Sequence, residues 1–394
     1  MRILLSNDWY YPDMRGGAEQ SVKLLSETLA SRGHQVSVLC TRSCDQEEPY
    51  EVINGVTVIR KPPAFCEGDS LPSKILAKCL CIDNPAADSY LSEVIRKVSP
   101  DILHTNTTNN HSLRIWKVAR RSGARIVHTL RDYGLWSPRG LLEEVNPVSA
   151  YGLFHGWYWR KCRKLSEIVD GVTAPSSFTL QAMVDKGFFP NAQRRRIVNA
   201  VSASCDEPRQ RFSTLRDPDV FSFLYMGRLI PVKGIDRLLR VFSSLDGDNL
   251  RLTVCGDGPL AVDVQEACIK DSRIEYKGHL KNEDLRLAMH NSDAVVVPSE
   301  WDEPFGRVVV EANSAGLPVI ATARGGLGEV MRDIGGGLLV ADGDDSILRD
   351  AMVRFSRRTC FDEYQASIER SLPLYSSEVQ AAAFEEFYDS VLSC

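Results

Sequence analysis

Two glutamates spaced eight residues apart, Glu303 and Glu311, form the most informative chemical pattern in the sequence. They bracket a Pro-Phe-Gly turn after a short apolar run, and we expect this turn to open a helix. The free N–H groups from Phe305 to Val308 would point out of the helix end as a site for an anion or a hydroxyl. Because eight helical residues span at most about 12 Å, the pattern suits a nucleotide-activated sugar, with hydroxyls at both ends and an anion between. Dipole complementation or simple solvation would explain either glutamate alone, but the pair favours a binding site.

Two cations, Arg228 and Lys233, follow the expected strand Phe221–Met226 and bracket a turn that contains Pro231. Cations that leave one strand end can neutralise a diphosphate as it departs. The alternative is a pair of surface cations beside a turn. Their position upstream of the paired glutamates favours the functional interpretation.

The first loop of the chain carries Gly16, Gly17 and Glu19. It lacks the G-x-G-x-x-G dinucleotide fingerprint, which argues against a nicotinamide enzyme. Glycines at this place permit a ligand to approach the backbone at a helix N-terminus. A plain turn remains an alternative for Gly16, and Glu19 alternatively serves only as a carboxylate favoured by the helix dipole.

A third group, His128, Arg131 and Asp132, lies at and after the expected strand Arg125–Thr129. We expect Arg131 and Asp132 to line a sugar or acceptor pocket, without assigning acid or base work to either. For His128 two interpretations stay open, a catalytic residue or a satisfied histidine at a strand end.

Metal binding is not expected. The patterns Asp217-Pro218-Asp219 and Asp342-Gly343-Asp344 have the form of a DxD metal motif. Both lie in expected turns or linker, where Asp, Gly and Pro are common for conformational reasons.

These residues need elements to position them, and short apolar strands alternate with helices along the whole chain. Such alternation implies parallel sheets with helices on both faces, and ligands bind such sheets at the carboxyl ends of the strands. In the first half, strands are expected at Arg2–Leu5, Gln35–Cys40, Asp101–Thr105, Arg125–Thr129, Val172–Ala174 and Arg196–Val198. In the second half, they are expected at Phe221–Met226, Leu250–Cys255, Arg273–Tyr276, Ala294–Val297, Pro318–Thr322 and Gly337–Val340.

The expected architecture is two Rossmann-like, doubly wound domains that face a central cleft. A polar, proline-bearing stretch at 205–219 is the expected linker. It divides the chain into domains 1–205 and 206–375, with a last helix at 376–394 that packs back on the first domain.

Composition excludes several classes of protein. The 394 residues include 43% hydrophobic and 25% charged residues, which fits folded domains rather than disorder. A net charge of −5 argues against binding to nucleic acid. Eleven cysteines without a CxxC pair indicate reduced thiols of a cytosolic protein. We also expect no signal peptide and no membrane span.

The ordered set of motifs resembles the large retaining glycosyltransferase family 4, whose members have the two-domain GT-B fold. The segment Glu303 to Glu311 resembles the E-x7-E motif of that family, and the further matches cover nearly the whole chain. They are Gly16-Gly17-Ala18-Glu19, Gly227-Arg228 with Lys233-Gly234, Gly256-Asp257-Gly258-Pro259, Gly325-Gly326-Leu327-Gly328-Glu329 and Gly336-Gly337-Leu338-Leu339-Val340.

The resemblance implies that the N-terminal domain binds the acceptor and the C-terminal domain binds the donor. Arg228 and Lys233 would bind the donor diphosphate in place of a metal, Glu303 the sugar hydroxyls and Glu311 the ribose. Many relatives have a histidine where this chain has Arg131. The full implied donor site comprises Gly16, Gly17, Glu19, Gly227, Arg228, Lys233, Gly256, Gly278, His279, Leu280, Glu303, Pro304, Phe305, Gly306, Arg307, Val308 and Glu311. Asn199 resembles the family's Pro-Asn-Gly turn without its proline and glycine, and we expect it to be structural.

A basic aromatic stretch, Trp157 to Lys164, has three aromatic residues and four cations within eight positions. It suits the headgroup region of an anionic membrane. The alternative is a helix with its aromatic residues in the core and its cations in solvent.

The resemblance implies transfer of a hexose from a nucleotide diphosphate sugar to a saccharide or lipid-linked acceptor, in bacterial surface polysaccharide or glycolipid synthesis. The expected location is cytoplasmic, at the inner face of the plasma membrane if the basic aromatic stretch binds lipid. A nucleotide-sugar epimerase of the same fold and a non-catalytic nucleotide-sugar-binding relative are the alternatives.

Overall fold

A computed structural model describes residues 1–14, 16–41, 50–62, 70–107, 109–201, 219–341, 343–358 and 360–394. The chain divides into two compact units. Unit 1 comprises Met1–Ala200 and Ser377–Cys394, and unit 2 comprises Val201–Ser376. The predicted class of two parallel-sheet α/β domains is confirmed. The expected boundary at 205/206 and all but the last residue of the expected linker lie outside the described residues.

The described residues of unit 1 form an eight-stranded sheet in the order β3-β4-β2-β1-β5-β6-β7-β8. All neighbours are parallel except the edge pair β3 and β4, which is antiparallel. The strands are β1 (Arg2–Ser6), β2 (Gln35–Thr41), β3 (Tyr50–Ile53), β4 (Val56–Lys61), β5 (Ile102–Thr105), β6 (Arg125–Thr129), β7 (Gly171–Ala174) and β8 (Gln193–Arg196).

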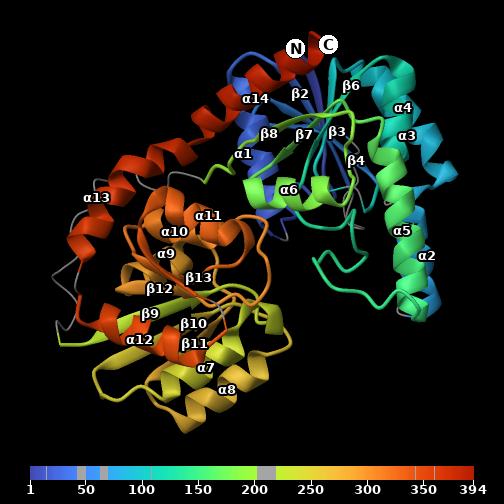
Figure 1. Cartoon of the computed structure of the whole chain (residues 1–394). Helices are drawn as coiled ribbons and strands as arrows, with labels where there is room; N and C mark the ends of the chain where they lie inside the picture. The colour runs from blue at the N-terminus through green and yellow to red at the C-terminus, as the bar shows by residue number, and fades with distance from the viewer. Residues whose placement is uncertain are drawn as a thin grey trace. The chain divides into compact units, whose positions relative to one another are not determined.

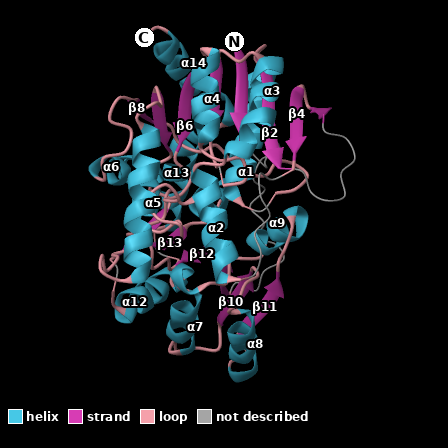
Figure 2. Cartoon of the chain, turned by 90° about the vertical axis from the view of Figure 1, so that its right-hand side faces the viewer, coloured by secondary structure: helices cyan, strands magenta, loops and turns pink. Residues whose placement is uncertain are grey.

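Helices cover both faces of this sheet, with α3, α4 and α5 on the side that Figure 2 turns to the viewer and α1 and α14 behind. They are α1 (Gly17–Ser31), α2 (Leu71–Ile82), α3 (Asp88–Val98), α4 (Arg114–Ser122), α5 (Ala150–Ser166), α6 (Ser177–Asp185) and α14 (Ser377–Leu392), with the 3-10 turn η1 (Pro85–Ala87).

The last helix, α14, packs against α1 and shares a hydrophobic cluster with it and with the sheet (Figure 1). A buried polar chain adds to this contact, because His104 Nδ1 lies 2.7 Å from the Tyr388 hydroxyl and its Nε2 lies 2.6 Å from the Thr129 hydroxyl. Thus α14 is a structural part of unit 1.

The described residues of unit 2 form a six-stranded sheet in the order β11-β10-β9-β12-β13-β14, with all neighbours parallel. The strands are β9 (Phe221–Met226), β10 (Leu250–Cys255), β11 (Ile274–Gly278), β12 (Ala294–Val297), β13 (Val319–Thr322) and β14 (Gly337–Val340). The helices are α7 (Ile235–Ser243), α8 (Ala261–Lys270), α9 (Asn282–His290), α10 (Arg307–Ser314), α11 (Gly325–Ile334), α12 (Asp345–Ser356) and α13 (Phe361–Ser371), with the 3-10 turns η2 (Pro231–Lys233) and η3 (Leu372–Tyr375). Aromatic residues of β9, α7 and α12 fill its core.

In each sheet, successive strands are added outward in one direction and then in the other, so that the strand order reverses between two neighbouring strands. In unit 1 this reversal lies between β1 and β5, and in unit 2 it lies between β9 and β12. The connections that leave two such strands diverge to opposite faces, which opens a crevice at their carboxyl ends. The residues that follow these four strands are therefore the ones that the fold offers to a ligand.

Two sequence expectations need correction. The strand expected at Arg196–Val198 lies earlier, at Gln193–Arg196, and the pair β3 and β4 was not expected at all. The other expected strands agree within two residues of each end. Among the described residues, no helix is both long enough and apolar enough to cross a membrane.

Candidate active site

Lys233 and Glu303, predicted to serve the same ligand, form an ion pair in unit 2. The Lys233 Nζ atom lies 2.6 Å from Glu303 Oε1, and the Ser299 hydroxyl donates to the same oxygen at 2.6 Å. The Glu303 side chain is only 12% exposed. Its other oxygen, Oε2, accepts no side-chain hydrogen bond from the part of the chain that the structure describes. One carboxylate oxygen is thus held by two donors, and the second remains available to a ligand hydroxyl.

The ion pair forms because β9 and β12 are neighbours at the reversal point of the sheet. Lys233 ends the turn η2 after β9, and Glu303 lies in the loop after β12. The two loops are tied together by a hydrogen bond from the Glu300 N–H to the Val232 carbonyl at 3.0 Å. The fold therefore fixes the spacing of the two charged groups.

Gly234 makes this close approach of the two loops possible. Its φ is +68°, and a Cβ atom there would lie 2.0 Å from the carbonyl oxygen of Pro298. Gly256 does the same for the neighbouring loop, since its Cβ would lie 1.8 Å from the carbonyl oxygen of Gly227. Two of the predicted glycine positions thus have a steric role in packing the loops around the site.

Arg228 is exposed at the end of β9, where its side chain can reach a ligand. A hydrogen bond fixes its backbone, because the buried Tyr225 hydroxyl donates to the Arg228 carbonyl at 2.9 Å. Burial raises the pKa of Tyr225, so the phenol stays protonated as the donor. Arg228 therefore has a fixed backbone and an accessible guanidinium.

Helix α10 begins later than the sequence suggests. Its first residue is Arg307 and its N-cap is Gly306, so Pro304 precedes the helix instead of opening it. No side chain among the described residues caps this N-terminus, and the Val309 N–H donates to the Gly306 carbonyl at 2.9 Å. Phe305 is buried, and its ring lies 6.2 Å from that of Tyr375. Val308 is half-buried in the first turn.

Glu311 lies one turn after Arg307 on the same helix, and Arg307 Nε donates to Glu311 Oε1 at 2.7 Å. Both side chains remain partly exposed. The two ends of the predicted motif thus have different settings, since Glu303 is paired with a residue of another loop and Glu311 with its own helix.

The expected nucleobase loop, Gly278-His279-Leu280, follows β11 at the far end of the sheet. Gly278 has a φ of +66° with open space around its Cβ position. The Gly278 carbonyl accepts a hydrogen bond from the Gly256 N–H at 2.8 Å, and His279 is exposed. This loop is joined through Gly256 to the loop that carries Arg228.

In unit 1, Arg131 is held between two asparagines. Its Nε donates to Asn106 Oδ1 at 2.9 Å, and its Nη1 donates to Asn199 Oδ1. Asn106 follows β5, whereas Asn199 lies after β8. The interpretation of Asn199 as structural was thus incomplete, because it positions a predicted site residue.

Two carboxyl groups interact with or adjoin Arg131, the buried Glu19 and the half-buried Asp132. Burial raises the pKa of Asp132, and its Oδ1 accepts the Gly134 N–H at 2.7 Å. Burial also raises the pKa of Glu19, the nearby Asp8 raises it further, and Arg131 opposes the shift. These two groups therefore resist ionisation.

His128 is part of the core of unit 1. Its Nδ1 lies 2.9 Å from the Thr105 hydroxyl, its ring stacks on Phe189 at 5.7 Å, and Trp116 meets it edge-on at 5.4 Å. Burial lowers the pKa of His128 to about 3. The histidine is neutral near pH 7, and its contacts are those of a satisfied core residue.

A small cavity of about 30 Å³, close to the size of one water molecule, lies beside these groups. Its polar wall includes Asn106, Asn109, His128, Arg131 and Asp132. The Nδ2 atom of Asn106 is buried and has no hydrogen-bond partner among the described residues. This cavity brings His128, Arg131 and Asp132 together, whereas Gly16, Gly17 and Glu19 do not line it.

Sequence analysis did not identify Asn106, Asn109 or Asp8 as site residues. Asp8 accepts hydrogen bonds from Asn109 Nδ2 at 3.0 Å and from the Asn110 N–H at 2.8 Å. The available signal was the pair of polar runs that directly follow β1 and β5, at the reversal point of the sheet.

The first glycine loop has a simpler geometry than expected. Helix α1 begins at Gly17, and Gly16 is its extended N-cap with φ −175°. A Cβ on Gly16 would meet Glu19 Oε2 at 3.5 Å, an ordinary contact. No steric requirement of unit 1 explains Gly16.

The basic aromatic stretch belongs to α5, and its three rings do not share one setting. Tyr158 is buried and donates to the Gly134 carbonyl at 2.7 Å, and Trp159 packs edge-on against Trp136 at 5.7 Å. Only Trp157 of the three is classed as exposed. For Tyr158 and Trp159 the structure thus agrees with the alternative interpretation, in which the aromatic residues pack within unit 1.

No group of three His, Cys, Asp or Glu side chains suited to a metal ion occurs among the described residues. The two DxD patterns cannot be placed, since Asp217, Pro218 and Asp342 lie outside the described residues.

Comparison with known families identifies both units. Residues 15–204 match the model described as "Glycosyltransferase Family 4", and residues 206–369 match "Glycosyl transferases group 1".

Individual relatives match over most of the chain. A Klebsiella pneumoniae protein, "Uncharacterized 42.6 kDa protein in cps region", is 30% identical over 84% of this chain and 88% of its own. A "GDP-mannose-dependent alpha-mannosyltransferase" of Mycobacterium tuberculosis is 27% identical over 96% and 95%. Among solved structures, Anabaena HepE in complex with UDP and glucose has a TM-score of 0.70 at 18% identity, over 99% of this chain and 100% of that one.

Proposed function

The chain belongs to glycosyltransferase family 4 and has the GT-B fold, and on this premise we propose that it transfers a hexose from a nucleotide diphosphate sugar with retention at the anomeric carbon. The observation that carries the proposal is the Lys233–Glu303–Ser299 cluster at the reversal point of unit 2. It offers a cation for a diphosphate and a free carboxylate oxygen for sugar hydroxyls within one small site.

The donor diphosphate would meet Arg228, Lys233 and the uncapped N-terminus of α10. The Lys233 ammonium can leave Glu303 and bind a phosphate oxygen of the donor instead. Because we place the phosphate next to this ion pair, the ammonium would move by about a few ångströms. Its positive charge then stabilises the negative charge that grows on the leaving phosphate. We assign this neutralisation to the two side chains and expect no metal to be required.

Glu303 would then hold the hexose through Oε2, while the Ser299 hydroxyl keeps Oε1 in place. Glu311 would accept a hydrogen bond from the ribose at the first turns of α10, with Arg307 as its counter-ion. Donor binding is thus assigned to unit 2 and acceptor binding to unit 1.

In the chemical step, the bond from the anomeric carbon to the phosphate oxygen breaks, and an oxocarbenium-like state develops. The acceptor hydroxyl attacks from the face that the phosphate vacates, which retains configuration. Its proton passes to the departing phosphate oxygen, so atoms and charges balance without a protein nucleophile. Arg131 and Asp132, whose pKa burial raises, would orient sugar or acceptor hydroxyls in this step.

The relatives favour a role in surface polysaccharide or glycolipid synthesis. The Klebsiella relative is named for a cps region, and the Anabaena structure was determined with UDP and glucose. A saccharide or lipid-linked acceptor fits this context.

The test is nucleotide release from a panel of nucleotide sugars, with product analysis by NMR to establish the anomeric configuration. Wild type, Glu303→Ala and Ser299→Ala are compared with Glu300→Ala as the control, since Glu300 is an exposed neighbour in the same loop. We expect acceptor-dependent release by wild type and the control, and strong loss in Glu303→Ala. Formation of an epimer without acceptor would indicate the epimerase instead. Binding without release would indicate the non-catalytic relative, and equal turnover by all variants would contradict the site assignment.

We further propose that α2 and α5 of unit 1 contact an anionic membrane at the inner face of the plasma membrane. The two helices pack together, as Figure 2 shows. Exposed apolar side chains occur on both helices and just before α5, with Leu76 58%, Leu153 67% and Val148 82% exposed. Apolar groups of this kind beside basic residues are typical of surfaces that insert into the interface.

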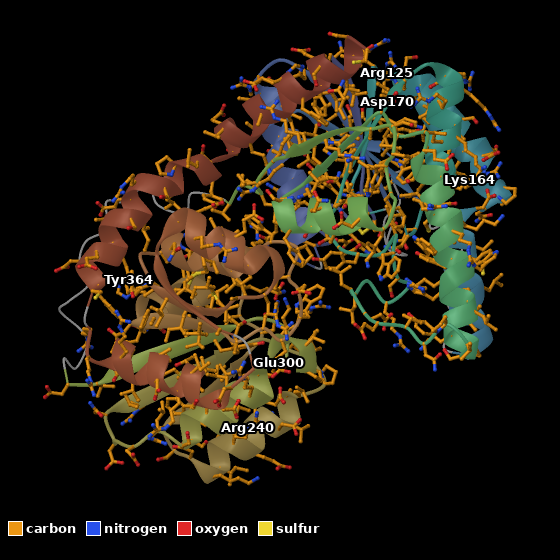
Figure 3. All side chains as sticks on the ribbon, viewed as in Figure 1. Arg125, Lys164, Asp170, Arg240, Glu300 and Tyr364 are labelled. Carbon is orange, nitrogen blue, oxygen red and sulfur yellow. The ribbon has the colours of Figure 1, made fainter. Side chains whose placement is uncertain are left out.

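The basic residues are supplied by the second half of α5 and by α2. Arg160, Lys161 and Lys164 are exposed, as is Lys74 on α2, and Figure 3 shows Lys164 on α5. Each cation near an anionic surface adds about 1 kcal/mol of attraction at low salt.

Binding to vesicles of phosphatidylcholine with and without phosphatidylglycerol tests this surface. Leu153→Asp and the triple variant Arg160→Glu, Lys161→Glu, Lys164→Glu should each lose sedimentation with the anionic vesicles. Lys270→Glu, an exposed charge reversal in unit 2, serves as the control. Unchanged binding by both surface variants would exclude α5 as the membrane contact.

A further inference from the structure

A second hollow of unit 1, with a volume of about 690 Å³, lies at the edge of the sheet opposite to the candidate site. Its wall includes Arg2 at the start of β1, Asp101 just before β5 and Arg125 at the start of β6. The candidate site residues follow the carboxyl ends of these same strands. The hollow is therefore separated from the proposed chemistry by the length of the sheet, and its size is within the range of small-molecule sites.

Four arginines line this hollow, which we call the arginine hollow: Arg2, Arg96, Arg121 and Arg125, around the single acid Asp101. Arg2 donates to Asp101 Oδ1 at 2.7 Å. Arg125 lies 3.2 Å from Asp170, and Figure 3 labels these two residues close to each other. Two of the four cations are thus already paired with acids.

The other two arginines, Arg96 and Arg121, are exposed and form no ion pair with any described residue. They lie in the last turns of α3 and α4, whose C-terminal ends meet at the hollow. A basic residue in a last turn is favoured by the helix dipole, which explains two arginines but not their convergence on one concave surface. Two guanidinium groups that line one hollow offer two positive charges to a doubly charged anion.

The floor of the arginine hollow is apolar. The side chains of Ile95 and Val118 are buried there, and Leu392 of α14 contributes a partly exposed side chain. A free inorganic ion would leave the exposed part of Leu392, which is 37% exposed, in contact with water. The lining therefore suits an anion that carries an apolar body.

We propose that the arginine hollow binds an organic phosphate, with the phosphate group on Arg96 and Arg121 and the apolar part of the ligand on Leu392, above the buried Ile95 and Val118. This site is independent of the donor diphosphate site in unit 2. Because it includes the end of α14, occupancy would also brace that helix against the sheet.

The experiment is isothermal titration of the full chain with phenyl phosphate and with glycerol phosphate, two probes of equal charge that differ in apolar surface. It is performed in an Arg228→Ala, Lys233→Ala background, so that phosphate binding in unit 2 is removed. We expect one site for phenyl phosphate, weaker binding of glycerol phosphate, and an affinity at least tenfold lower after Arg96→Glu with Arg121→Glu, because each charge-assisted contact is worth about tenfold or more.

The matched control carries Lys270→Glu with Arg286→Glu, which gives the same change in net charge at exposed positions of unit 2. A second variant, Leu392→Asp, places a negative charge at the wall and should also weaken binding without touching an arginine. Circular dichroism confirms that each variant is folded. Absence of binding in the background, equal affinity for the two probes, or equal loss in the control would overturn the proposal.

Discussion

The two units place polar groups at the same point of similar sheets, yet they manage charge in opposite ways. In unit 2, Glu303 is paired with Lys233 at 2.6 Å and has one oxygen free. In unit 1, burial raises the pKa values of Glu19 and Asp132, and Arg131 is fixed by two asparagines. Fixed charges suit a diphosphate and its sugar, whereas groups that resist ionisation suit a neutral hydroxyl acceptor.

The largest effect is expected when the Glu303 carboxylate is removed from the charged site of unit 2. Glu303→Ala should lower kcat/KM for sugar transfer by about a thousandfold, because it removes the sugar contact and leaves Lys233 without its partner. The measurement is steady-state kinetics with the best donor of the panel. Glu300→Ala should stay within about twofold, and a similar loss in both variants would show that the loop, not the carboxylate, is what matters.

The second effect tests whether the backbone of unit 2 sets the spacing of its charges. Gly234→Ala should destabilise the protein by about 3 kcal/mol or more, because the new Cβ clashes with the Pro298 carbonyl in addition to the left-handed strain. Gly278→Ala is the matched control, with φ +66° and open space, and should cost only about 1–2 kcal/mol. Equal losses in urea unfolding would show that loop packing contributes nothing.

A third effect sharpens the account of unit 1. Asn199→Ala removes the acceptor of Arg131 Nη1, and kcat should fall about tenfold, the worth of one charge-assisted hydrogen bond. The KM for the donor should not change, because donor binding is assigned to unit 2. Asn191→Ala, at an exposed asparagine of the same unit, is the control. A rise in donor KM with unchanged kcat would reverse the assignment of the two units.

The last effect concerns pH. Burial lowers the pKa of His128 to about 3 and that of His111 to about 4, and it lowers the pKa of His104 well below its usual value. The unfolded chain binds these protons near pH 6.5, so the stability they contribute is complete above that pH and is lost as the pH falls below it. Each histidine should add a slope of about 1.4 kcal/mol per pH unit.

Urea unfolding at a series of pH values between 7 and about 5 measures this slope. His128→Gln should reduce the slope of the unfolding free energy against pH by the contribution of one histidine. His279→Gln, at an exposed position of unit 2, should leave this slope unchanged. A slope that His128→Gln does not alter would mean that the histidine is protonated in the folded protein.

Much of the fold was predictable because strands of parallel sheets are short, apolar and regularly spaced. The five strands of unit 2 other than β11 were placed within one residue of each end. The sequence also assigned Lys233 and Glu303 to one ligand, and the structure adds the strand order that makes the ends of β9 and β12 neighbours. The edge pair β3 and β4 was missed because part of it faces solvent and its hydrophobic pattern is weak.

The parts that could not be predicted depend on contacts between distant segments. The bond between Arg131 and Asn199 joins two loops 68 residues apart, and no local pattern encodes it. The packing of α5 could not be predicted for the same reason. Its sequence shows three aromatic rings and four cations, but not which rings pack against Trp136 and Gly134. Burial of His128 likewise depends on Trp116 and Phe189, which reach it from other elements.

Hydrogen–deuterium exchange of the full chain, with and without the nucleotide diphosphate that the donor panel identifies, tests the division of labour between the two units most directly. Protection is predicted for the loops after β9 and β12, at 227–235 and 299–309, with little change at 106–110 and 130–134. Protection centred on the unit 1 loops, with 227–235 and 299–309 unchanged, would contradict the assignment of the donor to unit 2.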